Sequence, residues 1–204
     1  MKKYILSILL IALLTLTSCV RSLYPLTEDE KEMIFKKELL GHWKDKDGSE
    51  YFIDTVTGSG GKTYLARLID ATSSNSAKSQ FSDTSYFLVM LVNIKGKFFL
   101  DCSAEMKQLS SKKMGESAAY SLLPTHFILR VYSIQQNSIE MASIEKDAFS
   151  SLSRQKKINI RHEMIDKDDI LLTERPKTLQ QKLSGLEKFS SVYKRETLAR
   201  AGDN

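Results

Sequence analysis

The sequence predicts a mainly β protein, in which an antiparallel meander closes into a small barrel or a strongly curved sheet. Three observations favour this fold class. Apolar and polar residues alternate in eight segments that are rich in aromatic and β-branched residues. Short turn sequences join several of these segments. Helical periodicity is confined to a few stretches, which predict a short N-terminal helix and a C-terminal helix.

The eight predicted strands follow one another with short connections between several of them, as in a series of hairpins. Lys95-Gly96 and Gln136-Asn137 are the turns of two such hairpins. Consecutive strands joined in this way are antiparallel. The strands are expected over residues 51–56, 62–69, 84–94, 97–102, 126–134, 138–144, 158–164 and 170–173.

Three segments have helical character. Thr27 and Glu30 form a capping-box pattern, and the apolar spacing after them predicts a short helix ending near Gly41. A second helix is expected over 146–154. A third is expected over 176–188, where a proline occupies the first turn and leucines recur at helical spacing.

The N-terminus has the pattern of an export signal. Lys2 and Lys3 precede the uncharged apolar run 4–16, which is too short to cross a membrane as a helix. The following Leu16-Thr17-Ser18-Cys19 resembles the lipobox of bacterial lipoproteins. That resemblance implies a signal peptide over 1–18, cleavage before Cys19 and acyl chains on this cysteine. Residues 19–26 would then be the lipidated cysteine and a short tether, and 27–204 a single β-rich domain.

The residues after Cys19 bear on location. Val20-Arg21-Ser22 lacks the aspartate that resembles an inner-membrane retention signal, and it lacks the acidic cluster that resembles a surface-export signal. The expected location is therefore the outer membrane, lipid-anchored and facing the periplasm. The membrane is the expected partner, through the acyl chains on Cys19. Nucleic acid is not expected, because export separates the protein from it.

Gly41-His42-Trp43 resembles the Gly-x-Trp motif of lipocalin-like barrels. The resemblance implies that Trp43 plugs the closed end of a barrel. Arg175 and Arg195 are both candidates for the arginine that accompanies this tryptophan. The mature part is also similar to small uncharacterised lipoproteins of Bacteroidota, which implies no activity; the similar segments are Leu23-Tyr24-Pro25-Leu26, Leu39-Leu40-Gly41-His42-Trp43, Phe99-Leu100-Asp101 and Pro124-Thr125-His126-Phe127.

Few residues suggest chemistry. His126 and Arg130 share a strand face with apolar residues, as does His162 on another strand, so each is either a hydrogen-bonded core group or a polar group in a pocket. Cys102 is expected to be a buried, inert thiol. No nucleophile, carboxylate pair or metal-ligand spacing can be assembled, so neither an enzyme nor a metal or other cofactor is expected.

Three functions from different classes remain, of which the third, a hydrolase, has no assembled catalytic residues in its favour. The first is a non-catalytic interaction or accessory module of the cell envelope, with an envelope protein as its partner. The alternative is a lipocalin-like carrier of an apolar small molecule or lipid. An open cavity of several hundred Å³ inside the barrel, instead of a filled core, distinguishes the second from the first.

Overall fold

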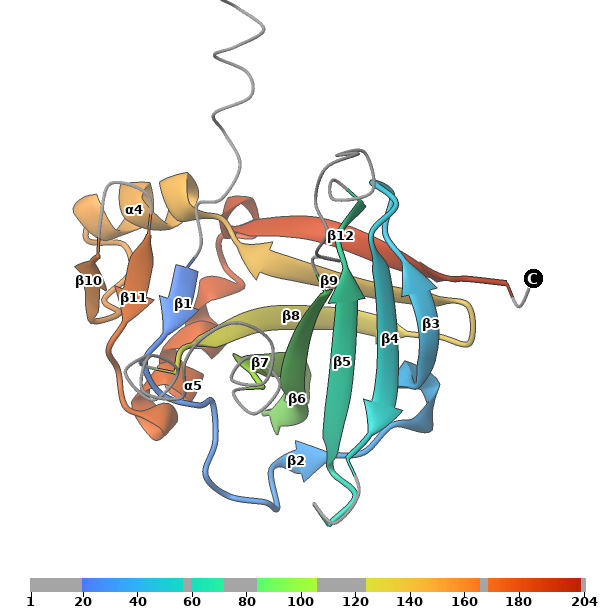
Figure 1. The fold of residues 1–204 in the computed structure, drawn as a ribbon. Coiled ribbons are helices and arrows are strands. Elements are labelled where there is room, and N and C mark those ends of the chain that lie inside the picture. The colour runs from blue at the N-terminus through green and yellow to red at the C-terminus, as the bar shows by residue number, and fades with distance from the viewer. Residues whose placement is uncertain (1–19, 57–59, 72–83, 106–123, 166–168, 203–204) are drawn as a thin grey trace, which may run out of the picture.

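The computed structural model describes residues 20–56, 60–71, 84–105, 124–165 and 169–202. Within these residues, eight antiparallel strands form a closed barrel (Figure 1), which confirms the predicted mainly β fold. The order around the barrel is β3 (Gly41–Lys44), β4 (Glu50–Thr55), β5 (Thr63–Ile69), β6 (Thr84–Ile94), β7 (Lys97–Ala104), β8 (His126–Ile134), β9 (Ser138–Ile144) and β12 (Tyr193–Arg200).

The strand that closes the barrel, β12, is one that the sequence did not predict. It pairs with β9 along most of its length, from Tyr193 opposite Ile144 to Ala199 opposite Ser138. Its last residues pair with β3 on the other side. Since β9 also pairs with β8, no edge of the eight-strand sheet is left open. The charged residues of β12 hide its alternation, because only a few of its positions are apolar.

Three further strands extend the sheet beyond β8. The N-terminal β1 (Val20–Ser22) lies between β8 and β11 (Ile170–Leu172), and β10 (His162–Met164) pairs with β11 on the outside. Residues expected to be a tether after Cys19 are therefore part of the sheet. The strand predicted over 158–164 is present only in its last three residues.

The helix predicted between Thr27 and Gly41 is present only as the three-residue 3-10 helix η1 (Lys37–Leu39). Upstream of it, β2 (Met33–Ile34) pairs with β6, and the hydroxyl of Tyr64 hydrogen-bonds the backbone N–H of Lys36 at 2.6 Å. These contacts satisfy backbone groups that a very short isolated helix would leave open to water, so tertiary pairing prevails over local helix propensity.

The two α-helices cover the outside of the barrel. α4 (Lys146–Arg154) starts where the Glu145 carboxylate accepts hydrogen bonds from two backbone N–H groups, and α5 (Pro176–Leu186) starts at a proline. A further 3-10 helix, η3 (Ser190–Val192), leads into β12. No helix among the described residues is long and apolar enough to cross a membrane.

Buried apolar residues form two separate clusters. One lies inside the barrel and contains Trp43, Val89 and Leu100. The other lies between the outer face of β6 to β9 and the covering elements α4, α5, β1 and β11. Strand β6 is apolar on both faces because one face contributes to each cluster: Val89 and Leu91 point into the barrel, whereas Val92 and Ile94 point to the outer layer.

Candidate functional site

The interior of the barrel contains a cavity of about 420 Å³. Its wall is built from β4 to β9, β12 and η1, and nearly all of the lining side chains are apolar. A cavity of this size lies in the range of ordinary small-molecule sites, which is about 300–1,000 Å³. The side chains of the described residues therefore do not fill the interior of the barrel.

Strand register explains where the space comes from. Ile53, Ala66 and Phe87 lie opposite one another on β4, β5 and β6, and all three line the cavity. The methyl group of Ala66 fills far less space than the two side chains beside it. On the next strands the neighbouring pair of Leu100 and Leu129 continues the wall. A larger residue at Ala66 would occupy the cavity.

Trp43 and η1 lie against each other in the interior cluster of the barrel. Trp43 is fully buried in the interior cluster, and its indole N–H donates a hydrogen bond of 2.9 Å to the carbonyl of Leu39. Leu39 in turn lines the cavity. The indole thus packs behind a residue that forms part of the cavity wall.

The arginine beside Trp43 is Arg200, not Arg175 or Arg195, the two candidates from the sequence. The guanidinium carbon of Arg200 lies 4.2 Å from the centre of the indole. Its N–H groups donate to the carbonyls of Leu40 at 3.1 Å and Glu38 at 3.2 Å, which fixes η1 across the barrel end. The other two arginines lie over tyrosine rings.

Two features of the structure require glycine at position 41, in the Gly-x-Trp motif. Gly41 has a φ of 125°, a conformation that side chains disfavour. A Cβ at this position would also lie 2.4 Å from Nη1 of Arg200. Gly41 therefore allows the guanidinium to reach the carbonyls of η1.

The cavity contains few polar groups. The hydroxyl of Tyr51 donates to the carboxylate of Asp45 at 3.2 Å, and burial together with the charge of Asp45 raises the pKa of Tyr51. Burial also raises the pKa of Cys102, whose thiol faces the cavity, so the thiol stays protonated. Glu196 is the charged lining residue, and its carboxylate has no hydrogen-bond or ion-pair partner among the residues that the structure describes.

His126 and Arg130 lie on the outer face of β8 and do not line the cavity, because the inward positions of this strand are Phe127, Leu129 and Val131. The Nδ1 atom of His126 lies 2.6 Å from the carboxylate of Asp101, which is fully buried. The same carboxylate accepts a 2.6 Å hydrogen bond from the N–H of Leu26. The pair thus fastens the N-terminal segment to β7 and β8.

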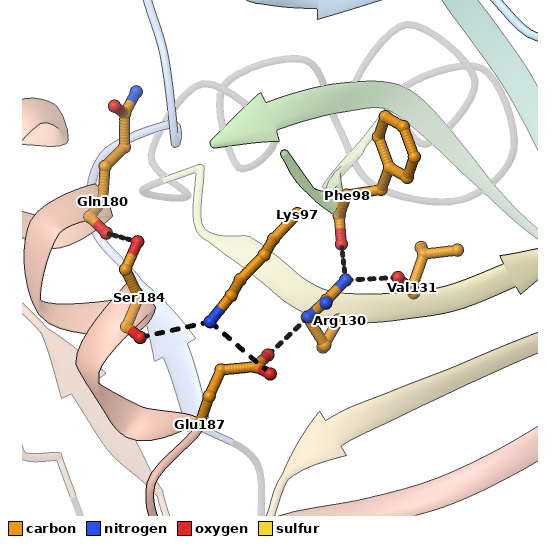
Figure 2. A network of polar contacts seen from close by, with 7 residues as sticks. All are labelled: Lys97, Phe98, Arg130, Val131, Gln180, Ser184 and Glu187. Carbon is orange, nitrogen blue, oxygen red and sulfur yellow. Dashed lines mark hydrogen bonds and ion pairs between the residues drawn. The ribbon is translucent and has the colours of Figure 1, made fainter. Parts of the chain in front are cut away.

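Arg130 connects the barrel to α5 (Figure 2). Its guanidinium donates to Glu187 at 2.5 Å, to the carbonyl of Phe98 at 2.9 Å and to the carbonyl of Val131. Lys97 lies 3.6 Å from the other oxygen of Glu187. These contacts hold the end of α5 against β7 and β8, so Arg130 is a structural group of the outer layer.

His162 also lies outside the barrel. Its Nδ1 atom is 2.8 Å from the carbonyl of Ile160, and its ring packs edge-on against Phe149 of α4. It lines an open hollow together with Lys156 and Arg161. The described residues contain no group of three His, Cys, Asp or Glu side chains that could hold a metal ion.

The structure does not bring His126, Arg130 and His162 together. The charged residue that lines the cavity is Glu196, which the sequence analysis did not identify. Glu196 and Arg200 both belong to β12, so overlooking that strand concealed them. The available signal was weak: Leu198 and Tyr193 alone mark the buried positions of the strand. Comparisons with protein-family models, with curated proteins and with solved structures find no match to this chain.

Proposed function

We propose that this protein binds an apolar small molecule or a lipid chain inside the barrel. The observation that carries the proposal is the cavity of about 420 Å³, lined almost entirely by apolar side chains. An apolar space of this size is costly to leave empty, because its lining loses the dispersion contacts of a packed core. On this ground we favour the carrier, which was the alternative from the sequence, over the interaction module that the sequence placed first.

The carboxylate of Glu196 refines the ligand class. It lies at the wall of an otherwise apolar space, and no lysine or arginine among the described residues forms an ion pair with it. A ligand with an apolar body and a cationic or hydrogen-bond-donating group would supply the missing partner, since a half-buried carboxylate gains from a charge-assisted hydrogen bond. An anionic ligand of the same length would instead be repelled.

The lipoprotein features belong to the same proposal. Acyl chains on Cys19 would hold the carrier at the outer membrane, facing the periplasm, where lipids and other apolar molecules are available. No catalytic step is part of this function.

The test uses N-phenyl-1-naphthylamine, an apolar dye that fluoresces when it leaves water. We expect the purified protein to bind it saturably. Ala66→Phe should abolish binding, because the ring occupies the cavity beside Ile53 and Phe87. The matched control is Ala199→Phe, which adds the same ring on the exposed face of β12 and should leave binding unchanged. Equal binding by both variants would show that the dye binds elsewhere.

The ligand class is tested by displacement of the dye. Decylamine should compete better than decanoate, and Glu196→Gln should remove the difference between the two. If decanoate competes as well as decylamine in the wild-type protein, Glu196 does not select the ligand. If no apolar compound binds and the protein instead purifies with an envelope protein, the interaction-module hypothesis is the better one.

A further inference from the structure

The polar side chains in the cavity wall decide which head group an apolar ligand can carry. Among the described residues that line the cavity, these side chains are Tyr51, Cys102 and Glu196. A thiol is only a weak hydrogen-bonding group, whereas a phenol and a carboxylate are strong ones. Tyr51 and Glu196 therefore provide the polar contacts that a ligand in this otherwise apolar space would meet.

Asp45 fixes the direction in which the hydroxyl of Tyr51 donates. One carboxylate oxygen of Asp45 accepts hydrogen bonds from the backbone N–H groups of Asp47 and Ser49, both at 2.9 Å. The other oxygen accepts from the hydroxyl of Tyr51 at 3.2 Å. A carboxylate has no hydrogen to donate in return, so the tyrosine hydrogen points to Asp45. The phenolic oxygen keeps its lone pairs and acts toward the cavity as an acceptor.

Glu196 is the second acceptor in the wall. Its charge reaches the phenol: burial is the main cause that raises the pKa of Tyr51, and the charges of Asp45, Glu196 and Asp70 add to it. A ligand that covers these two oxygens takes them out of water. If it donates no hydrogen bond to one of them, that oxygen is left unpaired and binding is weakened.

We infer that the ligand carries a head group with at least two N–H donors, such as a primary ammonium or a guanidinium, and that Tyr51 selects this group by accepting one of its hydrogens. This inference rests on the proposed binding of an apolar ligand in the cavity. It is distinct from the charge preference assigned to Glu196, because a quaternary ammonium has the same charge but no hydrogen to donate. The wrong head group is rejected because it leaves a polar group of the site unpaired.

The test compares decylamine with decyltrimethylammonium as competitors for bound N-phenyl-1-naphthylamine. The two compounds have the same charge and the same chain, and only decylamine has N–H donors. With the wild-type protein we expect decylamine to compete about tenfold better, which is the effect of one charge-assisted hydrogen bond. Tyr51→Phe keeps the ring and removes the acceptor, so this preference should fall by about threefold or more. It should do so without loss of dye binding.

Tyr86→Phe is the matched control. Tyr86 precedes the cavity-lining Phe87 on β6 and therefore faces the outside of the barrel. Removing its hydroxyl should leave the preference for decylamine unchanged. Because the trimethylated head group is also larger, the comparison of Tyr51→Phe with Tyr86→Phe separates the lost hydrogen bond from the effect of size.

Asp45→Asn tests the orientation of the phenol. The amide oxygen of the variant would still accept from the N–H groups of Asp47 and Ser49, so its NH₂ group would face Tyr51 and donate to the phenolic oxygen. The tyrosine hydrogen would then turn toward the cavity. The preference for decylamine should fall as in Tyr51→Phe, although the hydroxyl is still present. An Asp45 that only stabilises the turn would leave this preference as it is in the wild type.

The outcomes separate this inference from the proposed function. If the wild type binds no dye, the carrier is wrong and this inference fails with it. If the dye binds and the two cationic compounds compete equally, the barrel is a carrier but the selection of N–H donors is wrong. If decylamine competes better and Tyr51→Phe keeps the full preference, Tyr51 is not the residue that selects the head group.

Discussion

Arg200, near the C-terminus, connects three elements at one end of the barrel. It lies over the indole of Trp43 and donates to the carbonyls of Glu38 and Leu40, so it joins β12, β3 and η1. Arg195, on the same strand, pairs with Glu140 on an exposed face and is itself 62% exposed. Two arginines five residues apart thus have very different surroundings.

Arg200→Ala should therefore destabilise the protein by about 1–3 kcal/mol, since it removes charge-assisted hydrogen bonds and the cation–π contact. Arg195→Ala removes an ion pair and a cation–π contact with Tyr132 that are both open to water, so it should cost only about 1 kcal/mol. Urea unfolding measures both values. Trp43 emission should move to the red in Arg200→Ala alone, because water then reaches the indole. Equal losses in the two variants would contradict the assigned role of Arg200.

Cys102 offers a natural reporter inside the cavity. Burial raises the pKa of its thiol, so little thiolate is present near neutral pH. We expect methyl methanethiosulfonate to modify Cys102 much more slowly in the folded protein than in urea, and an apolar ligand to slow the reaction further. Mass spectrometry follows the modification. A folded-state rate equal to that in urea would mean that the thiol is not enclosed by the barrel.

At the scale of elements, Glu174 joins β10, β11 and α5. Its carboxylate accepts hydrogen bonds from the ammonium of Lys182 on α5 and from the N–H of Arg161 before β10. The hydrogen bond from Lys182 is the main cause that lowers the pKa of Glu174 from its ordinary value of 4.5, and Arg161 adds to it. The ionised form thus favours the folded state.

A lowered pKa means that this stabilisation is complete above pH 4.5 and is lost as the pH falls through the folded-state pKa. Glu174→Gln should lower the free energy of unfolding by about 1 kcal/mol near pH 7, since the partner Lys182 is partly open to water. The difference from wild type should shrink as the pH falls below 4.5. Urea titrations at several pH values measure it, and Glu28→Gln, an exposed carboxylate, is the control. A difference that is constant across this range would contradict the assigned contact.

Elements with clear periodicity could be predicted from the sequence. β6, β8, β9 and α4 begin and end at the predicted residues, because their alternation or helical spacing is strong. β12 could not be predicted in the same way, because its exposed face is charged and its inward face includes Glu196. β1 and β2 are two or three residues long and exist through pairing with distant strands, which local sequence does not record.

At the scale of the whole molecule, the barrel uses one sheet to bound two apolar spaces. Outward-facing residues of β6 to β9 complete a packed core with the helices, whereas inward-facing residues enclose the cavity. The residues of β6 are apolar on both faces, but the sequence alone could not distinguish a filled interior from an open one. Whether the interior is filled depends on the combined volume of side chains from seven strands and one 3-10 helix. Ala66 is one of the small side chains that leave space in it.

Because the cavity exists only in the folded barrel, a ligand inside it should stabilise the protein. A ligand that occupies the cavity binds only the folded barrel, so at a hundredfold excess over its dissociation constant it should raise the free energy of unfolding by about 2.7 kcal/mol. Urea unfolding of the wild type with and without N-phenyl-1-naphthylamine measures the increase. Ala199→Phe should gain as much as wild type, because its cavity is unchanged, and Ala66→Phe should gain nothing. Stabilisation of Ala66→Phe to the same extent would place the ligand outside the barrel, in the outer layer or at the open hollow beside His162.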